Sequence, residues 1–388
     1  MRRVYLDHAA TTPVRPEVFE AMVPYLQGKF GNPSSIHFFG REVRKDLDEA
    51  RERVAESLNA DPREIFFTAG GTEADNMAIF GSVARVGKKG GQIITSAVEH
   101  HAILDTCKSL EKQGYRVTIL PVDEWGMVLP RDLAEALTDD TILVSIMHAN
   151  NEVGTIQPIK ELIDAAHERK VRFHTDAVQS VGNIPVDVQD LGTDLLSISG
   201  HKIYGPKGVG VLYLRKGTEL GNIAYGGAQE RNLRPGTENV AGIIGLAKAL
   251  ELAVAEQAET KKRLTALRNK LIDGLTKLPD VILNGHREQR LPGNVNVSIL
   301  RVEGESLLLS LDMAGVAGSS GSACASGSLD PSHVLMAMGL DHQTAHGSLR
   351  LTLGKSTTEA DIDYVLSVIP GIIERLREMS PVRKPGEE

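Results

Sequence analysis

Short apolar runs alternate with amphipathic stretches through the first two thirds of this chain, and this alternation most constrains its fold. Seven runs are typical of buried strands, because each is short, apolar and bounded by turn residues. They cover residues 64–68, 92–96, 115–120, 141–147, 172–176, 195–199 and 209–214. Between them, residues 41–58 repeat apolar side chains every three or four positions, which predicts a helix. The alternation predicts an α/β fold with a largely parallel sheet.

The pattern changes near Glu238. Residues 238–279 have a long helical pattern, which predicts one helix or two helices joined by a kink. Two more strands are expected at 293–300 and 348–354. We therefore expect a large domain over residues 15–258 and a smaller α+β domain formed by residues 1–14 and 259–388.

Composition excludes several classes of protein. The 388 residues are 41% hydrophobic and 24% charged, as in ordinary globular proteins. Lys and Arg number 43 against 51 Asp and Glu, so the basic excess of a nucleic-acid binder is missing. No apolar run is long enough to span a membrane, and the start "MRRVYLDHAATTP" has no signal-peptide core. The only cysteines, Cys107 and Cys324, cannot build a disulfide framework, so we expect a reducing cytoplasm.

The most informative segment is "DLLSISGHKIYGPKGVGVLYL", residues 194–214. It places Lys202 just after a strand, beside small residues and before a glycine-rich turn. Lysine is the side chain that forms a Schiff base with a carbonyl cofactor such as pyridoxal phosphate. Taken alone, the pattern also fits a lysine in an exposed loop.

Three other segments favour a cofactor site. "GGTEADN" places Gly71 and Thr72 at a helix N-terminus, where backbone N–H groups bind phosphate, although a capped glycine turn gives the same pattern. Asp176 ends a buried strand and needs a partner, such as a protonated pyridine nitrogen, unless it is exposed. His100 follows another strand and could stack on a flat ring, or be structural. All these positions lie at carboxyl ends of strands, where open α/β sheets bind ligands.

Together these segments resemble a known family. "SGHKIYGPKGVG" is similar to the lysine signature of class V aminotransferase-like enzymes, which are fold-type I pyridoxal-phosphate enzymes. "YLDHAATTP", "GNPSSIH", "GGTEADN", "HANNEVG", "DAVQSVG" and "SSGSACASGSLDPSHVLMAMG" follow the order found in cysteine desulfurases of the NifS/IscS type. The resemblance extends from Tyr5 to about Asp363. It implies a mainly parallel seven-stranded sheet in the large domain and a smaller α+β C-terminal domain.

The resemblance also implies a role for each matching residue. Lys202 would hold pyridoxal phosphate as a Schiff base, and Cys324 would be the nucleophile. The other cofactor contacts implied are Gly71, Thr72, Ser199 and His201 at the phosphate, Thr237 at the phosphate of the neighbouring subunit in a homodimer, His100 stacked on the ring, Asp176 at its nitrogen and Gln179 at its phenolic oxygen. Asn151 and Arg350 would hold the substrate carboxylate. Asn151 would also belong to the cofactor site, and His100 to the catalytic residues.

The implied reaction takes L-cysteine to L-alanine. Lys202 would move the Cα proton, and the Cys324 thiolate would attack the substrate sulfur and become a persulfide. The glycine- and serine-rich segment around Cys324 is typical of a mobile arm that could carry the sulfur away. Cys107 lies within a helical pattern, which favours a packing role.

Partners follow from the same resemblance. A sulfur-acceptor or iron–sulfur scaffold protein would receive the sulfur, and Cys324 could transiently bind a cluster shared with that scaffold. The sequence shows no cluster of residues for a resident metal site. Gly71 and Gln229 replace an alanine and a histidine common in relatives, and we expect neither change to alter function. Alternatives are a selenocysteine lyase, another class V enzyme such as an aminotransferase, or a non-catalytic member of a sulfur-transfer complex.

Overall fold

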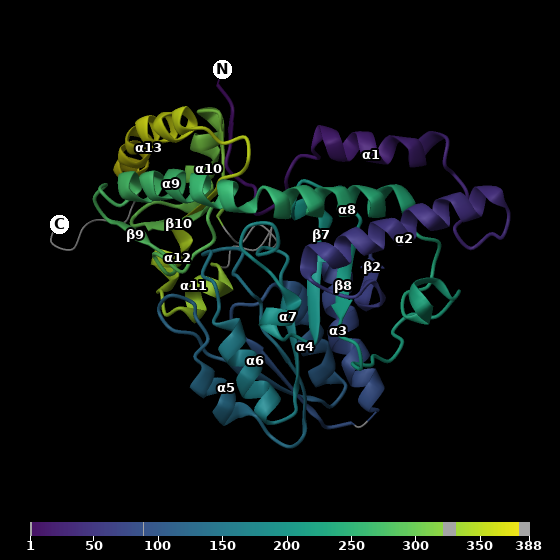
Figure 1. Ribbon diagram of the computed structural model, residues 1–388. Coiled ribbons are helices and arrows are strands. Elements are labelled where there is room, and N and C mark those ends of the chain that lie inside the picture. Colours follow the sequence, from purple (N-terminus) through teal and green to yellow (C-terminus); the bar gives the residue numbers. More distant parts are fainter. Residues whose placement is uncertain (1, 88, 321–330, 380–388) are drawn as a thin grey trace.

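The computed structural model describes residues 2–87, 89–320 and 331–379. Its largest element is a seven-stranded sheet in the order β2-β8-β7-β6-β5-β3-β4 (Figure 1). The strands are β2 (Ile65–Thr68), β3 (Gln92–Ser96), β4 (Arg116–Leu120), β5 (Thr141–Ser145), β6 (Arg172–Asp176), β7 (Leu195–Ser199) and β8 (Gly210–Leu214). β8 runs antiparallel to β7 and β2, and the other adjacent pairs are parallel. The predicted α/β fold with a mainly parallel seven-stranded sheet is confirmed.

All seven predicted strands are present, with ends that shift by one or two residues. The strand predicted at 141–147 ends at Ser145, and the strand predicted from Tyr115 begins at Arg116. Glu64 belongs instead to the short helix η1 (Pro62–Glu64), where its side chain and that of Asp61 form a capping box. This reciprocal pair of side-chain hydrogen bonds satisfies backbone N–H groups that would otherwise lack acceptors.

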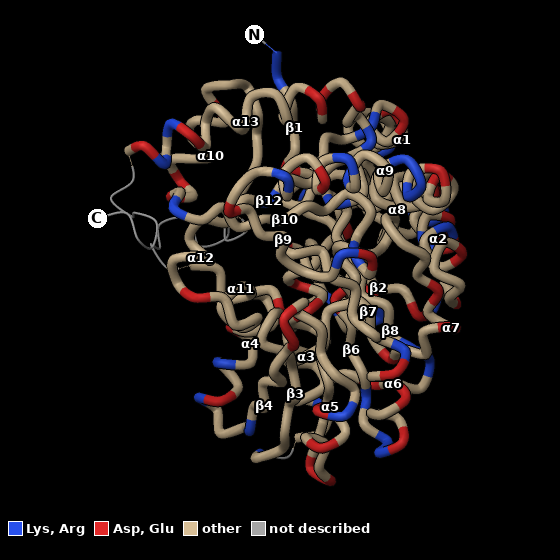
Figure 2. The backbone as a smooth tube through the Cα atoms, turned by 90° about the vertical axis from the view of Figure 1, so that its left-hand side faces the viewer, with Lys and Arg blue, Asp and Glu red and all other residues tan. Residues whose placement is uncertain are grey.

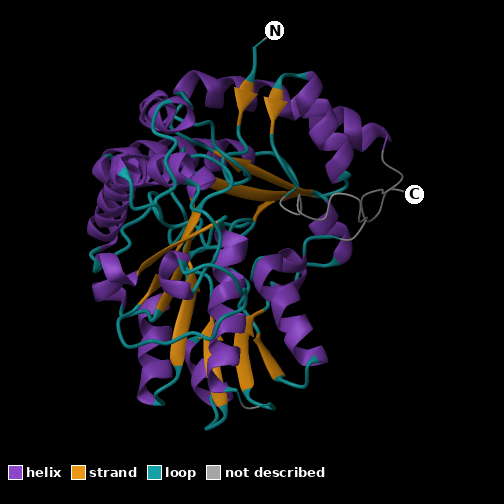
Figure 3. Cartoon of the chain, turned by 90° about the vertical axis from the view of Figure 1, so that its right-hand side faces the viewer, coloured by secondary structure: helices purple, strands orange, loops and turns teal. Residues whose placement is uncertain are grey.

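Helices cover both faces of the sheet (Figures 1 and 3). They are α1 (Pro16–Gln27), α2 (Phe38–Leu58), α3 (Gly71–Val86), α4 (His101–Lys112), α5 (Pro130–Ala136), α6 (Ile159–Glu168), α7 (Val188–Leu191) and α8 (Val240–Ala255). Successive strand residues point to opposite faces. Phe67 therefore packs in the cluster with α2 and α8, whereas Phe66 packs with α3 and α4. Cys107 of α4 is 1% exposed in this second cluster, as its predicted packing role requires.

A smaller α+β unit follows the large sheet. Its strands β9 (Val281–Leu283), β10 (Asn294–Ile299) and β12 (Ser348–Thr352) form an antiparallel sheet in the order β12-β10-β9, and β1 (Val4–Tyr5) pairs in parallel with β11 (Val316–Ala317). Its helices are α9 (Gln257–Leu275), α10 (Gly304–Met313), α11 (His333–Ala337), α12 (His342–His346) and α13 (Glu359–Met379). Figure 1 shows the purple N-terminal segment entering this unit beside α10. The N-terminal segment therefore packs with residues more than 300 positions away.

The long helical pattern near Glu238 forms two helices. α8 ends at Ala255 and α9 begins at Gln257, with Glu256 between them. Figure 1 shows α8 lying with α1 and α2, while α9 lies with α13. Leu246 and Leu250 of α8 belong to the core of the large sheet, whereas Leu267 and Leu271 of α9 belong to the core of the small one. The division of the chain near residue 258 stays a prediction.

Charges of both signs are interspersed along the backbone in Figure 2. In the part of the chain that the structure describes, no helix has the combination of length and apolarity that crossing a membrane requires.

Candidate active site

A cavity of about 870 Å³ opens at the carboxyl ends of the strands of the large sheet. Its walls come from the turns after β2, β3, β5, β6 and β7, from the N-terminal segment, and from β12 of the small unit. It brings together ten of the site residues predicted from sequence: Gly71, Thr72, His100, Asn151, Asp176, Gln179, Ser199, His201, Lys202 and Arg350. Thr237 does not line this cavity, and Cys324 lies outside the described residues. Residues from both sheets therefore meet at one place.

Lys202 ends the short helix η2 (Gly200–Lys202), which follows β7 directly. Its Nζ donates to the backbone carbonyls of Ala9, at 2.6 Å, and Ala10, at 2.8 Å. The same N-terminal segment contacts His201, whose Nδ1 lies 3.1 Å from Thr11 Oγ1. Residues 9–11 thus form a wall of the site. The motif that contains them was recognised from the sequence, but no role was assigned to them.

The turn between β2 and α3 forms a cradle of backbone N–H groups. Gly70 precedes α3 with φ +155°, a conformation that favours glycine. A Cβ at Gly71 would lie 2.7 Å from Val178 Cγ2, so alanine at this position requires Val178 to shift. The α3 helix has 16 residues, and the partial positive charge at its N-terminus favours an anion. Ser199, which is 4% exposed, and Thr72 line the cavity beside this turn.

Asp176 ends β6 and is buried, with 8% of its surface exposed. One of its oxygens, Oδ1, accepts a hydrogen bond of 2.8 Å from the Val178 N–H. Burial raises the pKa of Asp176 to about 6, although this hydrogen bond and the positive charge of Lys202 both lower it. The carboxylate therefore gains from a cation placed in the cavity.

His100 caps the N-terminus of α4. Its Nδ1 accepts from the Ala102 N–H at 3.1 Å, which fixes the orientation of the ring. Burial lowers the pKa of His100 to about 4, and the charge of Lys202 adds to this effect. The imidazole is therefore neutral near pH 7, as suits a ring that packs against another flat ring.

Arg350 reaches the cavity from β12 of the small unit and is 3% exposed. Its guanidinium donates to Asp7 Oδ1 at 3.0 Å and to the Asn151 carbonyl at 3.1 Å. Its Nε, which is buried, has no acceptor among the described residues. Asp7 was not predicted from the sequence, because it precedes its partner by 343 positions and no spacing rule links the two. A guanidinium held in this way can bind a carboxylate.

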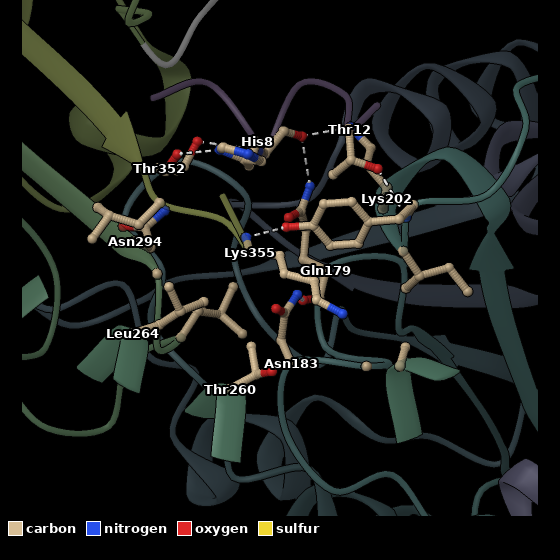
Figure 4. A pocket seen from close by; sticks show the side chains of 18 of the residues that line it. His8, Thr12, Gln179, Asn183, Lys202, Thr260, Leu264, Asn294, Thr352 and Lys355 are labelled. Atoms are coloured by element: carbon tan, nitrogen blue, oxygen red, sulfur yellow. Dashed lines mark hydrogen bonds between the residues drawn. The ribbon is translucent and has the colours of Figure 1, made fainter. Parts of the chain in front are cut away.

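Gln179 lines the cavity, and its predicted contact with the cofactor stays a prediction. Its Nε2 donates to the Ala9 carbonyl at 3.0 Å. Figure 4 shows Gln179 and Lys202 beside a second, smaller cavity of about 60 Å³, on whose far side lie Thr260 and Leu264. Residues 9–12 therefore separate two cavities, and Lys202 lines both.

Among the residues at 2–87, 89–320 and 331–379, no group of three His, Cys, Asp or Glu side chains could hold a metal ion. The titratable groups at the cavity instead suit an anionic, aromatic ligand that carries a protonated nitrogen.

Comparison with known proteins gives the family. Residues 4–365 match the model of the aminotransferase class-V family. A protein of Dictyoglomus turgidum described as "Cysteine desulfurase IscS" is 58% identical over 99% of this chain and 98% of its own length. A solved structure described as "NIFS-LIKE PROTEIN" covers 97% of this chain and 100% of its own, with 40% identity and a TM-score of 0.91.

A further solved structure is described as "SspA in complex with cysteine". It superposes with a TM-score of 0.80 at 35% identity, covering 90% of this chain and 98% of its own. The match thus extends over both sheets and the cavity between them. The chain belongs to the aminotransferase class-V family and, within it, to the cysteine desulfurases of the IscS and NifS type.

Proposed function

We propose that this chain is a pyridoxal-phosphate-dependent cysteine desulfurase, which converts L-cysteine to L-alanine and leaves the sulfur as a persulfide on Cys324. The observation that carries the proposal is the convergence of Lys202, Asp176 and Arg350 on one cavity in a chain 58% identical to an IscS desulfurase. The similar solved structure described as "SspA in complex with cysteine" supports the choice of substrate.

The residues at the cavity fit pyridoxal phosphate. The turn before α3 suits a phosphate, since the N-terminus of this 16-residue helix lines the cavity together with Thr72 and Ser199. Lys202 would hold the cofactor covalently through Nζ, and the buried Asp176 would pair with the protonated pyridine nitrogen. His100 would lie against the ring. When bound, this cofactor would draw electrons from the substrate amino acid and so weaken its Cβ–S bond.

The protein groups then divide the remaining tasks. Arg350 would bind the substrate carboxylate with its guanidinium, which lines the cavity while Asp7 and the Asn151 carbonyl hold it in place. Lys202 would carry the proton that leaves Cα and return it later. For this its Nζ has to be neutral, and the carbonyls of Ala9 and Ala10 hold two of its hydrogens in place.

The sulfur transfer conserves electrons. The thiolate of Cys324 forms an S–S bond with the substrate sulfur, while the C–S bond breaks and its electron pair stays with Cβ, which then takes up a proton. The products are alanine and a persulfide, so no outside oxidant or reductant is needed for this step. The role of Cys324 is proposed from the sequence match alone.

Delivery of the sulfur is the last part of the proposal. We infer that a partner protein takes the persulfide sulfur, either for iron–sulfur cluster assembly or for another thiolation reaction. The homodimer, in which Thr237 would reach the phosphate of the neighbouring subunit, is carried over from the family resemblance. The cytoplasmic location rests on the two cysteines, which cannot build a disulfide framework.

Three variants test the proposal. Lys202→Ala should lose both the visible absorbance of the lysine-bound cofactor and all turnover. Cys324→Ala should keep that absorbance yet transfer no sulfur, and normal sulfur release from this variant would disprove the nucleophile assignment. Arg350→Ala should raise the KM for cysteine far more than it weakens cofactor binding. Alanine and sulfide formed from cysteine are measured, with selenocysteine as a competing substrate and Arg44→Ala, on the exposed side of α2, as the control.

A further inference from the structure

A second buried carboxyl group lies at the cavity, and no step proposed above uses it. Asp75, in the second turn of α3, is 2% exposed and lines the same cavity as Asp176. Its Oδ1 is buried and has no hydrogen-bond donor among the described residues. A buried, ionised carboxylate without a donor is costly, so the state of this group needs an explanation.

A chain of hydrogen bonds in the middle of the sheet passes close to Asp75. Ser145 Oγ lies 2.8 Å from His174 Nδ1, and His174 Nε2 lies 2.9 Å from Ser197 Oγ. The same Nε2 is 3.7 Å from Asp75 Oδ1. Burial lowers the pKa of His174 to about 3, so the imidazole is neutral and offers Asp75 no counter-charge.

The titratable groups that face Asp75 come from β6 and from the turn after β3. Asp176 and His174 belong to β6, and Glu99 follows β3. Ser197 of β7 supplies a hydroxyl hydrogen bond, which lowers the pKa of Asp75. Burial raises that pKa more strongly, and the negative charges of Asp176 and Glu99 add to the rise. The net pKa of Asp75 therefore lies well above its ordinary value.

The two carboxyl groups differ in what stabilises a negative charge on them. Asp176 accepts the Val178 N–H and has the positive charge of Lys202 nearby, whereas Asp75 Oδ1 has neither. Two neighbouring carboxylates in a dry site do not both ionise, because their repulsion is only weakly screened there. The single proton of the pair therefore belongs on Asp75, and the negative charge on Asp176.

We propose that Asp75 is a positioning residue for the cofactor: as a neutral acid it holds the proton of the buried pair and so keeps Asp176 ionised for the pyridine nitrogen. The inference rests on the proposed function, because it assumes that Asp176 faces that nitrogen. Asp75 itself need not touch the cofactor.

The first test measures the proton on Asp75 without any cofactor. Urea unfolding of the full-length chain is followed from pH 4 to pH 8 for the wild type and for Asp75→Asn. A group that is protonated only in the folded state stabilises the fold at low pH, and this stability is lost as the pH rises above the pKa of the unfolded chain. In this pH range the folded wild type holds one proton more than the unfolded chain, on Asp75. Its folding constant should therefore fall about tenfold more per pH unit than that of Asp75→Asn.

The second test measures the effect on Asp176 through cofactor binding. Asp75→Asn keeps a donor and cannot ionise, whereas Asp75→Leu keeps the volume and has no donor. If the neutral Asp75 donates a hydrogen bond to Asp176, the loss of this donor in Asp75→Leu should raise the pKa of Asp176, so that less of it is charged at pH 7. We expect the dissociation constant of pyridoxal phosphate to increase at least tenfold in Asp75→Leu and to stay within about threefold in Asp75→Asn.

Each outcome decides the proposal. An unchanged pH slope in Asp75→Asn would show that Asp75 is ionised, and equal affinities in Asp75→Leu and Asp75→Asn would rule out the positioning role. If Asp75→Leu does not fold, Asp75→Ala replaces it. Asp105→Asn, at an exposed position of α4 paired with Lys108, is the control. A wild-type chain that binds no pyridoxal phosphate would refute the proposed function, while the unfolding test would still locate the proton.

Discussion

A buried ion pair outside the cavity gives the sharpest stability prediction. Arg51 of α2 is 9% exposed and Glu230 is 6% exposed. The two guanidinium Nη atoms of Arg51 each donate to one carboxylate oxygen of Glu230, at 2.8 Å and 2.6 Å. Glu230 also accepts the Phe67 N–H at 3.0 Å. Arg51 in turn donates to the Ile65 carbonyl at 2.7 Å. The pair thus fastens the segment at Glu230 to α2 and β2.

The backbone at Glu230 is strained. Glu230, Arg231 and Asn232 have φ values of 43°, 55° and 68°, three consecutive left-handed residues. Each non-glycine residue in this conformation costs about 1 kcal/mol, somewhat less for Asn. Removing one partner of a buried pair costs about 3–5 kcal/mol, because the other charge stays buried. Because the weakened segment can relax part of its backbone strain, the loss of unfolding free energy expected for Glu230→Gln lies near the lower limit, about 3 kcal/mol.

Urea unfolding of the full-length chain, followed by circular dichroism, measures this loss. Arg51→Met combined with Glu230→Gln should cost less than Glu230→Gln alone, since no charge is left unpaired. Asp48→Asn breaks the exposed pair with Arg44 on the same helix and should cost less than about 0.5 kcal/mol. A loss below about 1 kcal/mol for Glu230→Gln, or a double variant as unstable as the sum of the single ones, would refute the reasoning.

Three further predictions follow from buried or strained groups. Burial raises the pKa of Glu99 to about 8. The protonated side chain contributes its full share to the stability of the fold below about pH 4.5, and this contribution is lost as the pH rises from about 4.5 to 8. Glu99→Gln should flatten that part of the profile and stabilise the protein by roughly 3 kcal/mol at pH 7; an unchanged profile would contradict this. Lys170 has φ 59° after α6, so Lys170→Gly should raise stability by about 0.5–1 kcal/mol in the same urea assay, and any loss would count against the strain. Burial raises the pKa of Cys107 to about 12, so this thiol should react with Ellman's reagent only after unfolding.

Much of the fold was predictable because its signals are local. Each of the seven strands is marked by a short apolar run bounded by turn residues, a signal that lies within the strand and its immediate neighbours. The positions of Lys202 and Asp176 were predictable for the same reason, since each follows a strand at the edge where parallel strands end. The strand ends were less certain, as Glu64 shows, because a capping box competed with the strand pattern there.

The contacts of the site that were missed are those between distant parts of the chain. Asp7 meets Arg350 across 343 positions, and the carbonyls of Ala9 and Ala10 meet Lys202 across more than 190. Asp75 occupies an ordinary helical position, and its neighbour Asp176 is far away in sequence. Spacing rules describe side chains on one helix or strand, so they carry no information on such pairs.

The amino-acid sequence by itself determined the order of strands and helices, the glycine turn before α3 and the chemistry placed at each strand end. Only the tertiary structure decided which carboxyl groups are buried at one cavity, that Asp7 holds Arg350 there, and which backbone carbonyls hold the lysine. The physical reason is that charge, burial and solvent exclusion arise between surfaces that packing brings together, and packing depends on the whole chain.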